Sequence, residues 1–237
     1  MKLLHLYDDI MNLYGDYANV AALRRILENS GETVTVDKIS LGGQADLTDY
    51  DFVYIGSGTE ENQKLVMKDL ARYRGSLKAY IQDGKTALLT GNAFEMLGKS
   101  VTDSEGKVHE GLGLYDFTVT EQSKTRVTSD VIYEADFLDK PLVGFVNKCS
   151  EIQGIKDSLF TVKMGLGDFE GAKAEGIRDR NLFGTHLTGP ALIKNPHLLA
   201  YIARCVTGKQ PETAYLEHER AGYEITLNEL TKRTGES

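Results

Sequence analysis

The chain has 237 residues, of which 41% are hydrophobic and 26% are charged, and its formal net charge is −8. These values are typical of a globular protein and exclude a disordered or fibrous chain. The 27 basic residues are scattered among 35 acidic ones, so we expect no nucleic-acid partner and no attraction to anionic membranes. No apolar run approaches the roughly 18–20 residues that cross a bilayer. The N-terminus also lacks the features of a secretion signal, which predicts a cytoplasmic protein without membrane insertion.

The first 90 residues alternate between strand-like and helix-like segments. Apolar or alternating runs predict strands at 2–7, 33–39, 51–55 and 86–90. A helical repeat begins at Asp16 and ends near Gly31, and two helical pieces hinged near Gly75 fill 60–82. Because helices connect the strands, we expect an α/β fold with a mainly parallel sheet flanked by helices.

The pattern changes after residue 100, where short segments rich in Val, Thr, Tyr and Phe alternate with turn residues. They predict antiparallel strands at 117–120, 127–133 and 142–146, and a further strand at 182–187. Pro196 opens a predicted helix that runs through Ala203, and the sequence becomes polar after Gly208. We therefore divide the chain into an α/β domain at 1–208 and a polar helical C-terminal extension at 209–237.

Two places that follow predicted strands have small residues at which a ligand can approach the backbone. The first is Gly56-Ser57-Gly58, which suits an anion cradle or oxyanion hole, although a tight turn explains the same glycines. The second is Gly91, where strand 86–90 turns into a short helix. That layout is typical of a nucleophile elbow, but glycine offers no nucleophile, and an ordinary strand-to-helix turn has the same pattern.

Histidine and cysteine are sparse in the chain. His186 stands at the end of a predicted strand beside small residues, where it is either a titrating site residue or a structural one. The two cysteines, Cys149 and Cys205, form neither a disulfide framework nor a zinc motif. We therefore expect no metal and no cofactor.

A series of short motifs occurs in constant order over about residues 1–205. They are Asn12–Asn19, Ile55–Gly58 with Gln63, Met96–Lys99, Glu110–Phe117, Lys124–Arg126, Gly144–Asn147 and Asn181–Pro190. Together they resemble the CobB/CobQ-like class I glutamine amidotransferases. Within that family the resemblance is greatest to glutaminase subunits of the GatD type, which work with a Mur-ligase-like subunit, MurT.

The resemblance implies a flavodoxin-like three-layer fold and an ancestral reaction. Members of the family hydrolyse glutamine through a cysteine thioester with a histidine as base, and ammonia passes to a partner that amidates an ATP-activated carboxylate. Here the family cysteine falls on Gly91 and the family histidine falls on Thr188. Glycine has no thiol, and a threonine hydroxyl is a poor base at neutral pH, so we predict that glutaminase activity is absent.

The resemblance also implies a ligand site. Its expected residues are Gly56, Ser57, Gly58, Gln63, Asn92, Arg126 and Asn147. The guanidinium of Arg126 suits the carboxylate of glutamine or of another small ligand, although it is equally a solvated cation on a turn.

Three hypotheses follow. The leading one is an inactive GatD-like subunit that acts as the structural or regulatory partner of a Mur-ligase-like enzyme in a heterodimer. The second is an active amidotransferase subunit in which Cys149 and His186 form a relocated nucleophile and base, although Cys149 is also read as a buried small hydrophobe. The third is a stand-alone module that binds an amino acid or another carboxylate.

Overall fold

The computed structural model describes residues 1–122 and 126–235. Lys124 and Thr125, which belong to one motif of the resemblance, lie outside the described residues.

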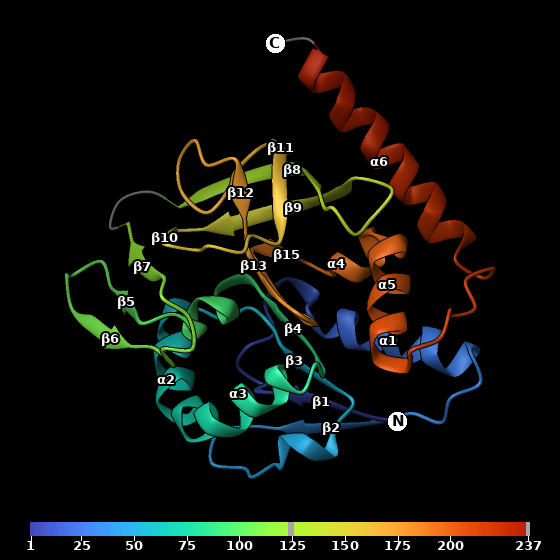
Figure 1. Ribbon diagram of the computed structural model, residues 1–237. Helices are drawn as coiled ribbons and strands as arrows, with labels where there is room; N and C mark the ends of the chain where they lie inside the picture. Colours follow the sequence, from blue (N-terminus) through green and yellow to red (C-terminus); the bar gives the residue numbers. More distant parts are fainter. Residues whose placement is uncertain (123–125, 236–237) are drawn as a thin grey trace.

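A six-stranded sheet forms the centre of the molecule (Figure 1). Its strands, in spatial order, are β13 (Ile177–Asp179), β14 (Leu182–Thr185), β4 (Thr86–Thr90), β3 (Phe52–Ile55), β1 (Lys2–Leu6) and β2 (Thr35–Ile39). All neighbouring pairs are parallel except β13 with β14 at one edge. Every residue of β3, β4 and β14 is buried, as expected for strands covered on both faces.

Helices cover both faces of this sheet, so the predicted three-layer α/β fold is confirmed. The helices are α1 (Tyr17–Asn29), α2 (Glu60–Leu70), α3 (Arg74–Gln82), α4 (Ala191–Lys194), α5 (Pro196–Thr207) and α6 (Glu217–Gly235). One apolar core packs α2 and α3 against the sheet, and a second core packs α1, α4 and α5 against it. The break within 60–82 falls at the 3-10 turn η3 (Ala71–Tyr73), and Gly75 lies inside α3 rather than at the hinge.

The strands of the second half form two smaller sheets. Their members are β5 (Ser100–Thr102), β6 (Val108–Glu110), β7 (Thr118–Glu121) and β10 (Ser150–Gln153) in one, and β8 (Val127–Glu134), β9 (Leu142–Lys148), β11 (Phe160–Met164), β12 (Ala174–Glu175) and β15 (Leu187–Thr188) in the other. Their pairs are antiparallel, as predicted, with the exception of β5 and β7.

The strand expected at 182–187 is divided between two sheets. β14 ends in the central sheet at Thr185, and β15 begins at Leu187 beside β9. The Thr185 hydroxyl accepts a hydrogen bond from the Leu187 N–H at 3.1 Å, a local contact that turns the chain out of the strand. His186 therefore stands where the chain passes from one sheet to the other.

The C-terminal segment forms one helix, α6, which extends away from the main body at its end (Figure 1). Its buried side chains, Tyr223 and Leu230, pack on Ile132 and Val143 of β8 and β9. The preceding helix, α5, ends at Thr207 and is capped by Gly208, which adopts φ 70°. In the part of the chain that the structure describes, no helix combines the length and the apolar character that a membrane span requires.

Candidate functional site around Gly91

The corner after β4 has the backbone of a nucleophile elbow. β4 ends at Thr90, and Gly91 begins the 3-10 helix η4 (Gly91–Leu97) with φ 59°, a conformation that costs residues with a Cβ about 1–2 kcal/mol. A Cβ placed on Gly91 would lie 2.1 Å from Oγ of Ser57 and 2.7 Å from its Cβ. The volume that a cysteine side chain needs at this corner is therefore filled by Ser57.

The Ser57 side chain is held there by a buried carboxylate. Asp16 Oδ2 accepts hydrogen bonds from the Ser57 hydroxyl at 2.7 Å, from the Ser57 N–H at 2.6 Å and from the Thr90 hydroxyl at 3.0 Å. Thr90 also contacts the Tyr54 hydroxyl at 2.7 Å, which accepts from the Asn19 amide at 2.9 Å. Burial raises the pKa of the Asp16 carboxyl, and its hydrogen bonds from Ser57 and Thr90 oppose that rise. The hydroxyl groups at the corner are thus satisfied through Oδ2 of Asp16, whereas its Oδ1 is buried without a hydrogen bond from the described residues.

The backbone amides of the expected anion cradle are occupied by this protein's own side chains. The Ser57 N–H donates to the carboxylate described above, and the Gly58 N–H donates to Oδ1 of Asn92 at 2.9 Å. The Asn92 amide returns a hydrogen bond to the Gly58 carbonyl at 3.0 Å. A Cβ on Gly56 would lie 2.5 Å from the Met11 carbonyl oxygen, and one on Gly58 would lie 2.2 Å from Met11 Sδ. The glycines therefore allow the loop after β3 to pack against the segment at Met11.

Arg126 binds a carboxylate, but that carboxylate is internal. One guanidinium nitrogen donates to Asn147 Oδ1 at 3.0 Å, and another forms an ion pair with Glu60. The Cys149 thiol donates to the same Glu60 oxygen at 3.2 Å. Burial raises the pKa of the Cys149 thiol to about 12, and the neighbouring Glu60 carboxylate contributes to the rise. The Glu60 carboxylate thus pairs with the guanidinium that the resemblance suggested for a ligand carboxylate.

These side chains line one small cavity. Gly91 and Thr188, the two positions that the resemblance assigns to the family cysteine and histidine, both border it. The cavity has a volume of about 20 Å³, which is room for about one water molecule. The Thr188 hydroxyl donates to the Phe145 carbonyl oxygen at 3.1 Å. A free amino acid needs more space, so its entry requires Glu60 and Arg126 to move.

A second group of polar side chains surrounds Glu95, towards the C-terminal end of η4. The sequence motifs did not indicate a role for this residue. Glu95 is 2% exposed and accepts from the Gln63 amide at 2.7 Å and from the Ser150 hydroxyl. Its Oε1 also contacts Nε2 of His186 at 2.9 Å. Gln63 is fully buried and also donates to the Asn92 carbonyl oxygen, so it holds η4 in place. The sequence did contain a signal for Glu95, namely a glutamate within the apolar run 93–97. A glutamate that is buried with such a run almost always has a polar partner.

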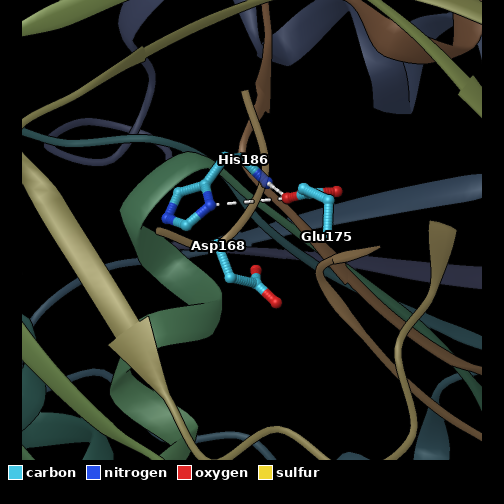
Figure 2. Close-up of side chains that lie close together, drawn as sticks. All are labelled: Asp168, Glu175 and His186. Carbon is cyan, nitrogen blue, oxygen red and sulfur yellow. Dashed lines mark hydrogen bonds and ion pairs between the residues drawn. The ribbon is translucent and has the colours of Figure 1, made fainter. Parts of the chain in front are cut away.

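The other side of the His186 ring faces Glu175 of β12 and Asp168 (Figure 2). The backbone N–H of His186 donates to Glu175 Oε1 at 2.6 Å, and the ring atom Nδ1 lies 3.4 Å from the same oxygen. The ammonium group of Lys148 donates to the carbonyl oxygens of Gly167 at 2.6 Å and Asp168 at 2.8 Å. With Glu95, five ionisable side chains are therefore buried together around the crossing between the sheets.

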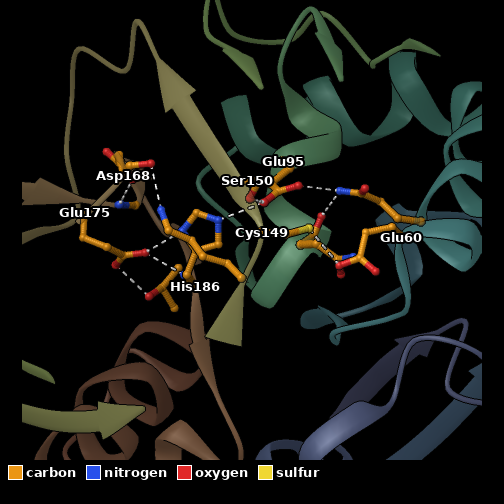
Figure 3. Close-up of polar contacts among 12 residues, drawn as sticks. Glu60, Glu95, Cys149, Ser150, Asp168, Glu175 and His186 are labelled. Carbon is orange, nitrogen blue, oxygen red and sulfur yellow. Dashed lines mark hydrogen bonds and ion pairs between the residues drawn. The ribbon is translucent and has the colours of Figure 1, made fainter. Parts of the chain in front are cut away.

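Cys149 and His186 belong to different groups of contacts (Figure 3). The contacts of the thiol are with Glu60 and Arg126, whereas the contacts of the ring are with Glu95 and Glu175. Figure 3 shows Glu95 and Ser150 between the two side chains. The described geometry therefore does not bring the two residues together as a nucleophile and its base.

The family model for the CobB/CobQ-like glutamine amidotransferase domain matches residues 2–196 of this sequence. The chain belongs to this family. A CobB/CobQ-like amidotransferase scaffold thus surrounds a corner at which residue 91 is glycine and offers no side chain.

Two curated proteins similar to this family member are GatD subunits of lipid II isoglutaminyl synthase (glutamine-hydrolyzing). The protein from Staphylococcus aureus (strain N315) is 33% identical over 202 residues, which are 85% of this chain and 82% of that protein. The protein from Streptococcus pneumoniae (strain ATCC BAA-255 / R6) is 32% identical over 201 residues, which are 84% of this chain and 77% of that protein.

Solved structures support the fold of the family member at much lower sequence identity. The structure of PurLQS from Thermotoga maritima has a TM-score of 0.55 and 10% identity, and the match covers 86% of this chain and 94% of that chain. A glutamine amidotransferase from the same organism has a TM-score of 0.53 and 13% identity, and the match covers 100% of this chain and 99% of that chain.

Proposed function

We propose that this chain is a GatD-type subunit that has lost glutamine hydrolysis and acts as the structural or regulatory partner of a MurT-like, Mur-ligase-like enzyme. The ligase would form amides in cell-wall metabolism in the cytoplasm, and the two chains would form a heterodimer. The similarity to GatD subunits of lipid II isoglutaminyl synthase over 84–85% of the chain supports this assignment.

The observation that carries the proposed loss of activity is the corner at Gly91. Gly91 itself has no side chain to attack an amide carbon, and Ser57 fills the volume in which a thiol would stand. Without the nucleophile, the covalent route is closed, which in triad enzymes accounts for most of the rate beyond binding. The Ser57 hydroxyl donates to Asp16 and the Thr188 hydroxyl donates to Phe145, so neither points a free donor into the cavity.

Two alternative functions are supported less well by the contacts. A thiol whose pKa is raised to about 12 remains protonated at neutral pH, and the thiolate is the reactive form, so Cys149 is a poor relocated nucleophile. A stand-alone carboxylate-binding module requires Arg126 to be open to its ligand, but Glu60 forms an ion pair with that side chain. Both alternatives require a rearrangement that the proposed partner role does not.

Glutamate release from glutamine is the decisive measurement, made on the purified chain alone and with its co-purified ligase subunit. We expect no release above the buffer rate in either sample. A variant that combines Ser57→Gly, Gly91→Cys and Thr188→His serves as the positive control, because it restores a thiol and an imidazole on two sides of the same cavity. We expect a glutamine-analogue electrophile to label position 91 in that variant only, whereas robust turnover by the unmodified chain would overturn the proposal.

An apolar patch at the edge of the cavity supports the partner role. Leu13, Tyr14 and Tyr17 are 37%, 44% and 57% exposed, and Tyr14 also lines the cavity. Exposed tyrosines beside a site are typical of protein interfaces. We expect Tyr17→Lys to reduce capture of the ligase subunit from native cells about tenfold or more. Val108→Lys changes an equally exposed apolar residue on β6 and is the matched control.

A further inference from the structure

The buried group around the sheet crossing contains three metal-ligating side chains. Asp168, Glu175 and His186 each offer one donor atom, and these atoms all lie within 4.8 Å of one another (Figure 2). The three residues are 5%, 0% and 1% exposed. They come from different parts of the fold, namely the loop between β11 and β12, β12 itself, and the crossing between β14 and β15.

One ring nitrogen of His186 is buried without a hydrogen bond and points into this group. Nε2 contacts Glu95 Oε1 at 2.9 Å, whereas Nδ1 has no hydrogen-bond partner. Nδ1 lies 3.4 Å from Glu175 Oε1, within ion-pair distance but without hydrogen-bond geometry. Two ligand atoms of a tetrahedral zinc ion with bonds of about 2.0–2.1 Å are separated by about 3.4 Å. The separation between Nδ1 and Oε1 is thus that of two ligands of one ion.

The surroundings are those of a metal ligand set. Histidine ligands usually donate their second ring N–H to a carboxylate, which fixes the tautomer and the ring orientation. Glu95 occupies that position here. The Glu175 carboxylate accepts hydrogen bonds from the backbone N–H of His186 at 2.6 Å and from the Thr185 hydroxyl at 2.8 Å. Asp168 Oδ1 accepts one from the backbone N–H of Gly176 at 2.9 Å. These bonds fix the orientation of both carboxylates.

The charges of the group also favour a cation. Glu95, Glu175 and Asp168 carry three negative charges when ionised, and Lys148 carries one positive charge. A histidine must be neutral to bind a metal ion, and with His186 neutral the group has an excess of two negative charges. The ammonium group of Lys148 donates to two backbone carbonyl oxygens rather than to these carboxylates. A divalent ion would remove that excess charge.

We propose that Asp168, Glu175 and His186 bind a divalent transition metal ion, with Zn²⁺ as the best match. An imidazole nitrogen with carboxylate oxygens suits zinc, whereas Mg²⁺ and Ca²⁺ prefer sites built from oxygen alone. The second oxygen of Asp168 can complete four ligands. Because the group is closed to solvent, the ion would be structural and would link the central sheet to the second sheet. Ligands 7 and 11 residues apart lie outside the short motifs that mark zinc sites, so the sequence analysis expected no metal here.

The test uses the full chain after dialysis against a chelator. Addition of Zn²⁺ alone is expected to give one bound ion per chain by elemental mass spectrometry and to raise the melting temperature. His186→Gln and Glu175→Gln are expected to abolish both effects, and Glu95→Gln is expected to weaken binding about 10–100-fold. His109→Gln is the matched control, because His109 also pairs with a carboxylate, that of Asp103, but away from this group. A Cys149→Ser variant should keep the ion.

Two results would overturn the proposal. One is a correctly folded wild-type chain that neither retains zinc nor gains thermal stability from it, which would make the group a buried imidazolium with its ion pairs. The other is zinc binding that survives both His186→Gln and Glu175→Gln. If those variants fail to fold, Co²⁺ bound to the wild-type chain decides the question, since its visible absorption bands report a four-coordinate nitrogen and oxygen ligand set without any substitution.

This inference does not depend on the proposed function. Loss of glutamine hydrolysis rests on Gly91 and Ser57, whereas the metal site rests on residues at the opposite end of η4 and beyond it. Glutamate release and zinc stoichiometry are separate readouts, so either proposal can fail while the other stands.

Discussion

The two ends of η4 differ in how their space is filled and in how many ionisable side chains meet there. At the Gly91 end, Ser57 fills the corner and Asp16 accepts its hydrogen bonds, so one short network closes the space. At the Glu95 end, carboxylates outnumber cations and a buried ring nitrogen of His186 has no hydrogen bond. Two ends of one seven-residue 3-10 helix can therefore have different surroundings, one filled by a neighbouring side chain and the other lined by buried ionisable groups.

The largest effect is expected at the closed end of η4. Gly91→Ala should lower the free energy of unfolding by about 2–5 kcal/mol, because it adds the cost of positive φ to an overlap with Ser57. Urea denaturation measures this change. Gly84→Ala is the matched control, since Gly84 has φ 73° and no atom within 4 Å of the added Cβ, and it should lose only about 1–2 kcal/mol.

A double-mutant cycle sharpens that result. Ser57→Gly removes the overlapping atoms, so Gly91→Ala should cost less in the Ser57→Gly background than in the wild type. Equal costs in the two backgrounds would show that Ser57 does not limit the space at the corner, and the contrast between the two ends of η4 would lose its basis.

An intermediate effect is expected at the charged end, as a dependence of stability on pH. Asp168 has a folded pKa of about 7, against an unfolded value near 3.8, so between these pH values the folded chain holds a proton that the unfolded chain has lost. Stability from this group is therefore full below about pH 4 and is lost as the pH rises through 7, with a slope of up to about 1.4 kcal/mol per pH unit. Asp168→Asn should remove that slope.

The measurement compares unfolding free energies of wild type and Asp168→Asn between pH 4 and 8 in chelator-treated buffer. Taking the difference cancels His5 and His197, whose pKa values burial lowers to about 4 and which act with the opposite sign. Lys148, Glu175 and His186 face Asp168 in both proteins. A difference that stays constant across this range would mean that Asp168 is ionised throughout.

The smallest effect is expected at the cavity mouth. Glu60→Gln should change stability by less than about 1 kcal/mol, because the Glu60 and Arg126 side chains are 32% and 42% exposed. It should nevertheless lower the pKa of the Cys149 thiol by removing a neighbouring negative charge, and alkylation at pH 8 should become several-fold faster. The rate is measured in a Cys205→Ser background. An unchanged rate would assign the raised pKa to burial alone.

Much of the fold could be predicted from the sequence, because the pattern of buried positions in a helix or strand requires a matching pattern of apolar residues. β3 and β4 are short and mostly apolar runs that are buried on both faces, and α1 repeats Val20, Leu23 and Leu27 on its buried side. The division of 182–187 into β14 and β15 could not be predicted, since every residue there is buried and the turn depends on one hydroxyl, that of Thr185.

The features of the site that depend on local backbone conformation could be predicted from the sequence. The hydrogen-bond and ion-pair partners of its side chains could not. Positive φ at Gly91 and a place for Arg126 beside Asn147 follow from local pattern and resemblance. The occupation of Arg126 by Glu60, 66 residues away in sequence, does not. Glu95 was missed for the same reason, because its partners come from segments far along the chain.

The overlap between Gly91 and Ser57 has a consequence for how this sequence can change over generations. A cysteine that arrives first at position 91 lowers stability before it brings any chemistry, whereas loss of the Ser57 hydroxymethyl group first leaves room for it. The order of the two substitutions therefore decides the stability of the intermediate protein, and a thiol fits at this bend only after the Ser57 side chain has been shortened.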